Sequence, residues 1–355
     1  MVMRLVLKYI LPIFLLLTFF SCMDYGPVDT ENLDFSDSGR GLFIVNEGNF
    51  MYGNASLSYY DIETKIVENN VFSRANGINL GDVAQSMVIH NGKGYVVVNN
   101  SGIIFIIDIN TFKVRGMIDG FISPRNIFIS GSNKGYVTDL YSEAIVEVDL
   151  DSNTKLGTII TKGHPSTEQI VAVNSELFVC CWSNDNIIFV IDPSTNAIMD
   201  SIIVPFQPNS MVVDINNKIW VVSSGAYNSE NFGSPSPTLS IIDPTNRLVE
   251  HSIGLEGGES PVSIATNGAR DTVYVLNNGV YGYSVLDDSF SPAQIVGKSD
   301  ALYYDFTVDP VTSEIYIADA IDYVQAGAVY RYSPKGIPVD TFRVGIIPGG
   351  FCFKE

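Results

Sequence analysis

After residue 40 the chain consists of short apolar runs separated by polar or small residues. Seven of these runs begin with a bulky apolar residue and end in polar or small ones. They start at Leu42, Tyr95, Tyr136, Phe178, Trp220, Tyr274 and Tyr316. Successive starts lie between 41 and 54 positions apart, and a period of about 40–50 residues is typical of β-propellers, whose units are four-stranded sheets.

Two further apolar runs repeat in step with the first. One follows each of the seven runs and closes on a polar residue, at Asp61, Asp108, Asp149, Asp192, Asp243, Asp287 and Ser333. The other precedes six of the seven and begins at Ser86, Asn126, Gln169, Ser210, Ser263 and Asp305. The unit that contains Leu42 has no such preceding run, whereas residues 350–354 form a run without a partner.

We therefore expect the last strand of the chain to complete the first unit. The predicted fold is all-β: a seven-bladed β-propeller over residues 41–355, with its first blade closed by the C-terminal strand. Such a ring leaves only short, protected sheet edges. The alternative of two unrelated β domains requires a linker and a change of period, and the sequence shows neither.

The N-terminal segment has the features of an export signal. Arg4 and Lys8 precede an apolar stretch at residues 10–20, which is too short to cross a bilayer of about 30 Å as a helix. Ser21 stands directly before Cys22. We expect residues 1–21 to be a lipoprotein signal peptide and Cys22 to be the lipidation site; the alternative is a plain secretory signal with an incidental cysteine.

Residues 22–40 carry several acidic side chains and no apolar periodicity, which predicts a flexible acidic tether. The predicted protein is thus exported and contacts the membrane through its lipid anchor only. Its formal net charge of −19 argues against nucleic-acid binding, because phosphates require a basic surface. Cys180 and Cys181 are neighbours on one strand and point to opposite faces, so we expect buried free thiols rather than a disulfide.

Long loops favour one face of the disc as the binding surface. Neighbouring strands are antiparallel, so the loops between second and third strands share a face with the connections from one blade to the next. Three of these loops, near residues 47–55, 225–237 and 320–327, are longer than a hairpin needs. Aromatic rings and amides alternate in them, a combination that suits a broad, mostly neutral ligand with polar groups.

The candidate ligand-binding residues of this face combine aromatic, amide and charged side chains: Asn46, Asn49, Phe50, Tyr52, Asn99, Asn100, Arg125, Asp139, Tyr141, Trp182, Tyr227, Phe232, Asn277, Tyr281, Asp319 and Tyr323. Two alternatives stand beside the binding role. Many of the asparagines can simply bond their own loop backbone, and Arg125 can form a salt bridge with a nearby acid.

Catalytic and metal-binding patterns are scarce. No two histidines have the helical i, i+4 spacing of a metal site, and no glycine-rich phosphate loop precedes a helix. We expect no catalytic residues, no metal and no cofactor. Asp82, Glu168, Glu259 and Asp305 lie near the starts of innermost strands, where they can ring the axis or serve as solvated acids and loop caps. An enzyme such as a propeller lyase would need an acid and a base over the axis, for which His164 and Glu168 are the candidates.

Several segments carry a resemblance to known proteins. Tyr136-Val-Thr-Asp and the stretch from Val190 to Pro208 resemble the YVTN and YncE-like seven-bladed propellers. Val45-Asn-Glu-Gly-Asn-Phe, Leu80-Gly-Asp-Val-Ala-Gln-Ser-Met and Ala318-Asp-Ala-Ile-Asp-Tyr look like surface lipoproteins of gut Gram-negative anaerobes described as surface-layer proteins. That group includes the BtuG-type corrinoid-capturing proteins.

The resemblance implies a location and a function. It implies a lipoprotein exposed on the outer membrane that binds cobalamin or a related corrinoid, without catalysis, and passes it to a TonB-dependent outer-membrane transporter. A corrin is a flat, wide ring fringed with amides, which fits an aromatic and amide-rich face. A surface-layer or protein/glycan interaction module is the alternative function, and a propeller lyase is the third.

Overall fold

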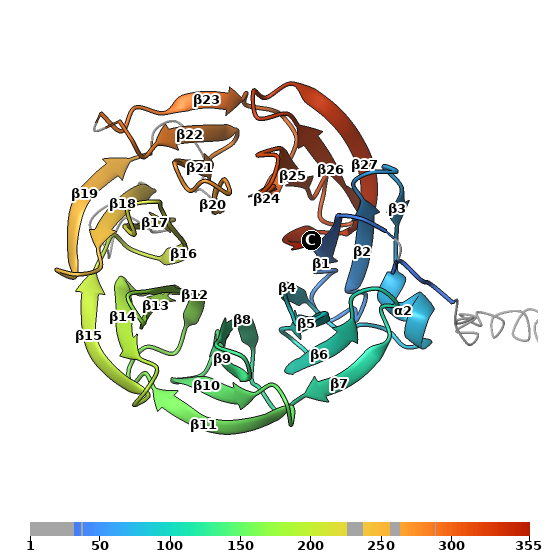
Figure 1. Ribbon diagram of the computed structural model, residues 1–355, viewed down its shortest axis with the longest axis horizontal. Coiled ribbons are helices and arrows are strands. Elements are labelled where there is room, and N and C mark those ends of the chain that lie inside the picture. Colours follow the sequence, from blue (N-terminus) through green and yellow to red (C-terminus); the bar gives the residue numbers. More distant parts are fainter. Residues whose placement is uncertain (1–31, 37, 226–236, 256–262, 288) are drawn as a thin grey trace, which may run out of the picture.

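The computed structural model describes residues 32–36, 38–225, 237–255, 263–287 and 289–355. Their strands form seven separate four-stranded antiparallel sheets. The sheets are arranged around a common axis, as Figure 1 shows, and the four strands of each blade follow one another outward from that axis. The predicted all-β, seven-bladed propeller is confirmed.

Each blade has two inner strands, of which the second is the more deeply buried. The innermost strands, in blade order, are β28 (Pro348–Lys354), β4 (Ala84–His90), β8 (Pro124–Ser130), β12 (Thr167–Val173), β16 (Pro208–Val213), β20 (Ile264–Thr266) and β24 (Tyr303–Val308). The second strands are β1 (Gly41–Asn46), β5 (Lys93–Val98), β9 (Lys134–Asp139), β13 (Glu176–Cys181), β17 (Ile219–Ser223), β21 (Thr272–Leu276) and β25 (Ile315–Asp319).

The two outer positions complete each blade. The third strands are β2 (Ser56–Asp61), β6 (Ile103–Asp108), β10 (Ala144–Asp149), β14 (Ile187–Asp192), β18 (Thr238–Asp243), β22 (Val280–Ser284) and β26 (Ala326–Tyr332). The outermost strands are β3 (Val67–Glu68), β7 (Val114–Ile118), β11 (Thr154–Ile160), β15 (Ala197–Ile203), β19 (Leu248–Gly254), β23 (Ala293–Val296) and β27 (Pro338–Ile346). A short helix, α2 (Val71–Asn76), follows the two-residue strand β3.

The first blade is completed by the end of the chain. Strand β28 pairs with β1 in antiparallel register, with Gly41 opposite Lys354 and Ile44 opposite Phe351. In Figure 1 the red C-terminal strand stands beside the blue β1 at the axis. This is the predicted closure, and it makes blade 1 out of both ends of the described chain.

Turn chemistry explains why the repeat is visible in the sequence. The carboxylate of Asp61 accepts the backbone N–H groups of Glu63 and Thr64, at 3.0 and 2.8 Å, and so fixes the turn from the third to the outermost strand. Asp108, Asp149, Asp192 and Asp243 end their strands and do the same. Aspartate is favoured there because its short side chain can bond the backbone two residues on. Asp287 lies three residues beyond the end of β22, but it also caps a turn.

The core lies between the blades. Each pair of neighbouring blades encloses its own cluster of buried apolar side chains. Alternate residues of one strand serve two different clusters, because successive side chains point to opposite faces. Cys180 packs between blades 4 and 5, whereas Cys181 packs between blades 3 and 4. Both thiols are buried and free, as predicted.

Part of the segment predicted as a tether packs on the propeller. The Phe35 ring lies 5.0 Å from that of Tyr59 and 5.3 Å from that of Phe112. Arg40 forms a 2.6 Å ion pair with Asp309 of blade 7. The two apolar residues Leu33 and Phe35 interrupt the acidic stretch and cover the edge of the cluster between blades 1 and 2. Among the described residues, no helix combines the length and apolarity needed to cross a membrane; Cys22 lies outside them.

Candidate functional site

A ring of backbone hydrogen bonds defines one face of the disc. In each blade a residue at the end of the second strand donates its N–H to the carbonyl just before the innermost strand. The seven pairs are Glu47–Ile347, Asn99–Val83, Leu140–Ser123, Trp182–Ser166, Ser224–Gln207, Leu276–Ser263 and Ala320–Leu302. The loops that follow the second strands therefore share a face with the connections between blades, as predicted. We call this face the loop face.

A cavity of about 550 Å³ occupies the axis at the loop face. Every blade contributes a lining residue at or near the start of its innermost strand or the end of its second strand: Glu47, Gln85, Arg125, Glu168, Asn209, Ser263 and Tyr304. Most of these side chains are polar. The axial cavity can therefore hold polar atoms of a ligand that covers the mouth of the ring.

Arg125 is the cation of the axial cavity. Its Nε donates to Glu168 Oε2 at 2.7 Å, and its Nη1 donates to Gln85 Oε1 at 2.5 Å. The guanidinium also lies over the Trp182 ring, 5.5 Å from the ring centroid. The salt bridge that the sequence offered as an alternative for Arg125 is thus present, and the predicted site residues Arg125 and Trp182 meet in the cavity.

Two acids of the axial cavity have strongly raised pKa values. Burial raises the pKa of Glu47 to about 7, although the Tyr304 hydroxyl donates to its carboxylate at 3.0 Å. Burial likewise raises the pKa of Asp305 to about 7, against a hydrogen bond from Ser263. Among the described residues neither carboxylate forms an ion pair, and Arg125, whose charge lowers the Glu47 pKa only in part, is engaged by Glu168. Near neutral pH each can therefore present either a carboxyl or a carboxylate to the cavity.

The sequence placed only part of this acid set correctly. Glu168 and Asp305 line the axial cavity, as proposed. Asp82 does not; its carboxylate caps a loop by accepting the Met51 N–H at 2.9 Å. Glu259 lies outside the described residues. Glu47 was missed as a site residue, although it occupies the same position in its blade as Trp182 does in blade 4.

Exposed aromatic rings stand on the loop face. Phe50, Tyr52, Tyr141 and Tyr323 expose 64, 79, 69 and 42% of their surface. Tyr323 packs edge-on against Tyr304, with 5.9 Å between ring centroids, and so connects this surface to the axial cavity. Asn49 Nδ2 donates to the Tyr323 carbonyl at 2.5 Å, which joins the long loops of blades 1 and 7.

Several predicted site residues are buried and hold the fold. Asn46 Nδ2 donates to Ser58 Oγ at 3.0 Å, and Asn99 Nδ2 donates to the Pro124 carbonyl of the next blade at 3.0 Å. Asn277 is also buried. Asn100 is exposed, but its amide donates to Asp82 at 2.6 Å. Asn46, Asn99 and Asn100 therefore bond the protein, but through side chains or the backbone of the next blade rather than through the backbone of their own loop.

The two predicted site residues Asp139 and Asp319 have the same structural role, in blades 3 and 7 respectively. Asp139 accepts the Ser123 N–H at 2.9 Å, and Asp319 accepts the Leu302 N–H at 3.0 Å. Each carboxylate thus fastens the connection that enters its own blade, and both side chains are buried. Tyr281 lies within β22 and packs on the cluster between blades 5 and 6. Tyr227 and Phe232 lie outside the described residues.

Comparison with known proteins gives the family. Residues 40–344 match a family model described as a domain of unknown function, DUF5074. The chain belongs to the DUF5074 family. No curated protein matches it.

Solved structures similar to this DUF5074 chain share its fold at low sequence identity. One is a quinonprotein alcohol dehydrogenase-like protein from Bacteroides thetaiotaomicron, with a TM-score of 0.68 and 15% identity over 90% of this chain and 79% of that one. Another is the Kuenenia stuttgartiensis hydrazine synthase, with a TM-score of 0.66 and 14% identity over 76% of this chain and 89% of that one. At these identities the likeness concerns the fold alone.

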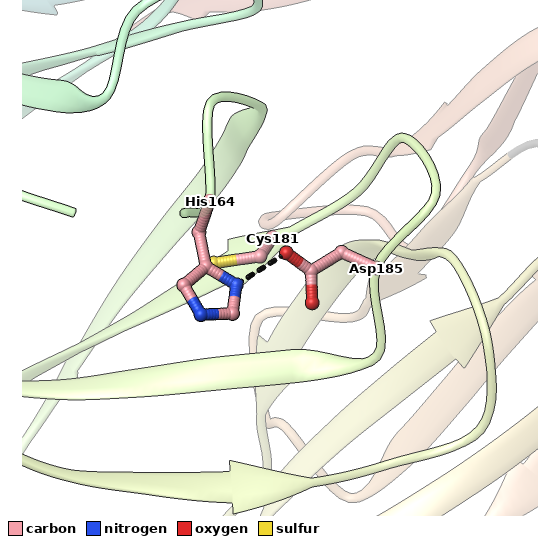
Figure 2. A group of neighbouring side chains, drawn as sticks. All are labelled: His164, Cys181 and Asp185. Atoms are coloured by element: carbon pink, nitrogen blue, oxygen red, sulfur yellow. Dashed lines mark hydrogen bonds and ion pairs between the residues drawn. The ribbon is translucent and has the colours of Figure 1, made fainter. Parts of the chain in front are cut away.

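The acid and base considered for a lyase have different partners in the DUF5074 structure. His164 Nδ1 lies 2.6 Å from Asp185 Oδ2 (Figure 2). The imidazole also stands edge-on to Phe189. Glu168 is held by Arg125 in the axial cavity. His164 is not among the residues that line that cavity. In the described residues His164 and Glu168 therefore do not converge over the axis.

Proposed function

We propose that this DUF5074 protein is a non-enzymatic binding protein that captures a corrinoid on its loop face. The observation that carries the proposal is the combination of exposed rings with a central polar cavity. Phe50, Tyr52, Tyr141 and Tyr323 offer stiff apolar area, and the axial cavity offers hydrogen-bonding groups within the same face. A flat macrocycle fringed with amides needs both kinds of contact.

The contacts between Tyr323 and the axial cavity support a ligand that covers both. Tyr323 touches Tyr304, and Tyr304 donates to Glu47 inside the cavity. A ring stacked on Tyr323 can therefore place its polar fringe over Glu47 and Arg125. The acidic, exported character predicted from the sequence supports a role outside the cell, and the resemblance to corrinoid-capturing lipoproteins supports handover to a TonB-dependent transporter of the outer membrane.

Isothermal titration with cyanocobalamin and cobinamide tests this function. We expect binding by the unmodified protein and at least a tenfold weaker affinity in Tyr323→Ala and Phe50→Ala, because loss of a well-packed aromatic contact costs about 1–2 kcal/mol or more. Ile203→Ala is the matched control, since Ile203 is 70% exposed but lies on the outermost strand β15. Absence of heat with both corrinoids at micromolar protein would rule the proposal out.

The lipid anchor has its own test. We expect palmitate labelling of the protein in cells to disappear in Cys22→Ala. Labelling that survives this substitution contradicts a lipoprotein anchored at Cys22. It does not affect the test of corrinoid binding by titration.

One observation favours a second function, a protein or glycan interaction module. Met51 and Val324 expose 77 and 70% of their surface beside Phe50 and Tyr323, and they extend the apolar area of the loop face beyond the rings. Contiguous exposed apolar area is typical of docking surfaces. This function would be favoured if a partner captured from outer-membrane extract by the unmodified protein is lost with Met51→Lys, and if titration with corrinoids gives no heat of binding.

A further inference from the structure

Three side chains of types that can ligate a metal converge on the loop face of blade 4, apart from the axial cavity. Cys181 is the last residue of β13, Asp185 lies in the loop to β14, and His164 lies in the connection from β11 to β12. One ligand atom of each, an imidazole nitrogen, a thiol sulfur and a carboxylate oxygen, lies within 4.8 Å of the others. Figure 2 shows the three side chains pointing toward one another.

The backbone holds these side chains in place. The His164 N–H donates to the Thr161 carbonyl at 2.8 Å, which closes a tight turn. The Asp185 N–H donates to the Trp182 carbonyl at 3.1 Å, and the Asp185 carbonyl accepts the Gln207 N–H at 2.7 Å. Cys181 is paired on both sides, with Thr167 and Ile187. Three ligands on such fixed backbone form a preorganised site.

The carboxylate of Asp185 is oriented by a further hydrogen bond. Its Oδ1 accepts the Asn186 N–H at 2.7 Å, and its Oδ2 faces His164. A hydrogen bond to the outer oxygen of a ligating carboxylate is the usual support of a metal site.

Burial is graded across the cluster. Cys181 is fully buried between blades 3 and 4. The Asp185 side chain is 11% exposed and the His164 side chain is 31% exposed. A cation here would be enclosed by protein on the Cys181 side and open to solvent on the His164 side, which leaves room for a fourth ligand from solution.

We propose that His164, Cys181 and Asp185 form a site for a borderline-soft divalent cation of the Zn²⁺ type. Zinc takes nitrogen, sulfur and oxygen ligands in a four-coordinate arrangement, and three protein ligands plus one open position is a known form of zinc site. Calcium and magnesium prefer oxygen ligands only. The mixed N, S and O set therefore selects a transition-type cation.

The charges of the site balance. A thiolate, a carboxylate and a neutral imidazole carry two negative charges, which one divalent cation neutralises. Binding releases the thiol proton to solvent. The proton that His164 Nδ1 donates to Asp185 Oδ2 in the metal-free site is exchanged for one on Nε2, so that the neutral imidazole can ligate through Nδ1. No net charge is then buried, so the desolvation cost is small compared with that of an isolated ion. The net charge of −19 also attracts cations to the surface.

The chain offers a matched control for the thiol. Cys180 is the preceding residue on β13, is equally buried and free, and points into the cluster between blades 4 and 5. A cation held by Cys181 should not be affected by the loss of Cys180. Trp182 follows Cys181 and lines the axial cavity, so the metal site and the proposed corrinoid site are neighbours with different residues.

Titration of the untagged, reduced protein with Co²⁺ and Zn²⁺ tests the site. We expect one equivalent of Co²⁺ to bind with a thiolate-to-cobalt charge-transfer band and the visible bands of tetrahedral cobalt, and Zn²⁺ to displace it. Cys181→Ala should abolish the charge-transfer band, and Cys180→Ala should keep it. His164→Ala should weaken Zn²⁺ binding by more than about 100-fold, because even second-shell losses cost 10–100-fold.

Several results would overturn the proposal. One is a cobalt spectrum without a charge-transfer band in the unmodified protein, and another is an identical spectrum in Cys181→Ala. Circular dichroism verifies that Cys181→Ala is folded; if it is not, His164→Ala and Asp185→Asn, which alter partly exposed side chains, decide the matter. Unchanged Zn²⁺ affinity in both of these variants also refutes the site.

Discussion

Arg125 of β8 and Glu168 of β12 join the innermost strands of blades 3 and 4 through a 2.7 Å ion pair between Nε and Oε2. Their side chains are only 16 and 9% exposed. The pair therefore sits in the wall of the axial cavity rather than on the rim. Breaking such a shielded pair by removing one partner leaves an uncompensated charge, which costs far more than loss of a surface pair.

Arg125→Ala should lower the free energy of unfolding by about 3 kcal/mol, because it leaves the buried Glu168 carboxylate without its cationic partner. Urea unfolding followed by fluorescence measures this change. Arg115→Ala is the control: Arg115 pairs with Asp108 at 3.0 Å but is 56% exposed, so the cost should stay below about 1 kcal/mol. Equal costs in the two variants would contradict the structural role given to the buried pair.

Glu47 and Asp305 should make the stability of the protein fall as pH rises from about 5 to 7. Their pKa values rise from ordinary values of 4.5 and 3.8 to about 7 in the folded protein because of burial. Between those values the folded state binds more protons than the unfolded state, so the free energy of unfolding decreases with pH and levels off above about pH 7. Urea unfolding at pH 5, 6, 7 and 8 measures the slope.

Neutral substitutions identify the groups responsible for that slope. The free energy of unfolding should fall less between pH 5 and pH 8 in Glu47→Gln than in the unmodified protein. We expect the two falls to differ by on the order of 1 kcal/mol. Asp192→Asn is the control, because hydrogen bonds from Ser194 lower the pKa of Asp192 below 3.8 and place its titration outside this range. A slope unchanged by both Glu47→Gln and Asp305→Asn would show that neither acid is responsible.

Deletion of residues 351–355 should open the ring. It removes most of β28 and with it the pairing of Ile44 with Phe351 and of Gly41 with Lys354. It also removes the Lys354 ammonium, which donates to the Phe35 carbonyl at 2.7 Å. We expect the melting temperature to fall by about 10 °C or more, since several kcal/mol are lost. Deletion of the exposed Glu355 alone is the control, and a similar melting temperature for both truncations would argue against closure by β28.

The fold was predictable because its turns have chemical requirements that recur. Asp61 and its counterparts stand where a side chain must bond the backbone two residues on, and the bulky residues that lead the second strands, such as Tyr136 and Trp220, fill the space between blades. Both requirements return once per blade. A period therefore appears in a single sequence even where the loops differ.

The site was only partly predictable, because a residue type does not determine where its side chain points. Asn99 and Asn100 are adjacent amides with the same expected role. Asn99 is nevertheless buried and donates to the Pro124 carbonyl, whereas Asn100 is exposed and donates to the Asp82 carboxylate. Glu47 is one position beyond a strand end, and the hydrogen bond from its N–H to the Ile347 carbonyl holds it beside the start of the innermost strand β28. The exposed rings Phe50, Tyr52 and Tyr323 were placed correctly on the loop face, since long loops there must leave them in solvent.

The pairing of Gly41 with Lys354 also determines when this protein can finish folding. The two residues are more than three hundred positions apart, and they belong to the first and last strands of the ring. During synthesis six blades can assemble in turn from neighbouring segments, but blade 1 must wait until residues 348–354 have left the ribosome. Blade 1 is thus the last blade to gain all four strands, and pairing over so long a sequence separation makes ring closure a late step of folding.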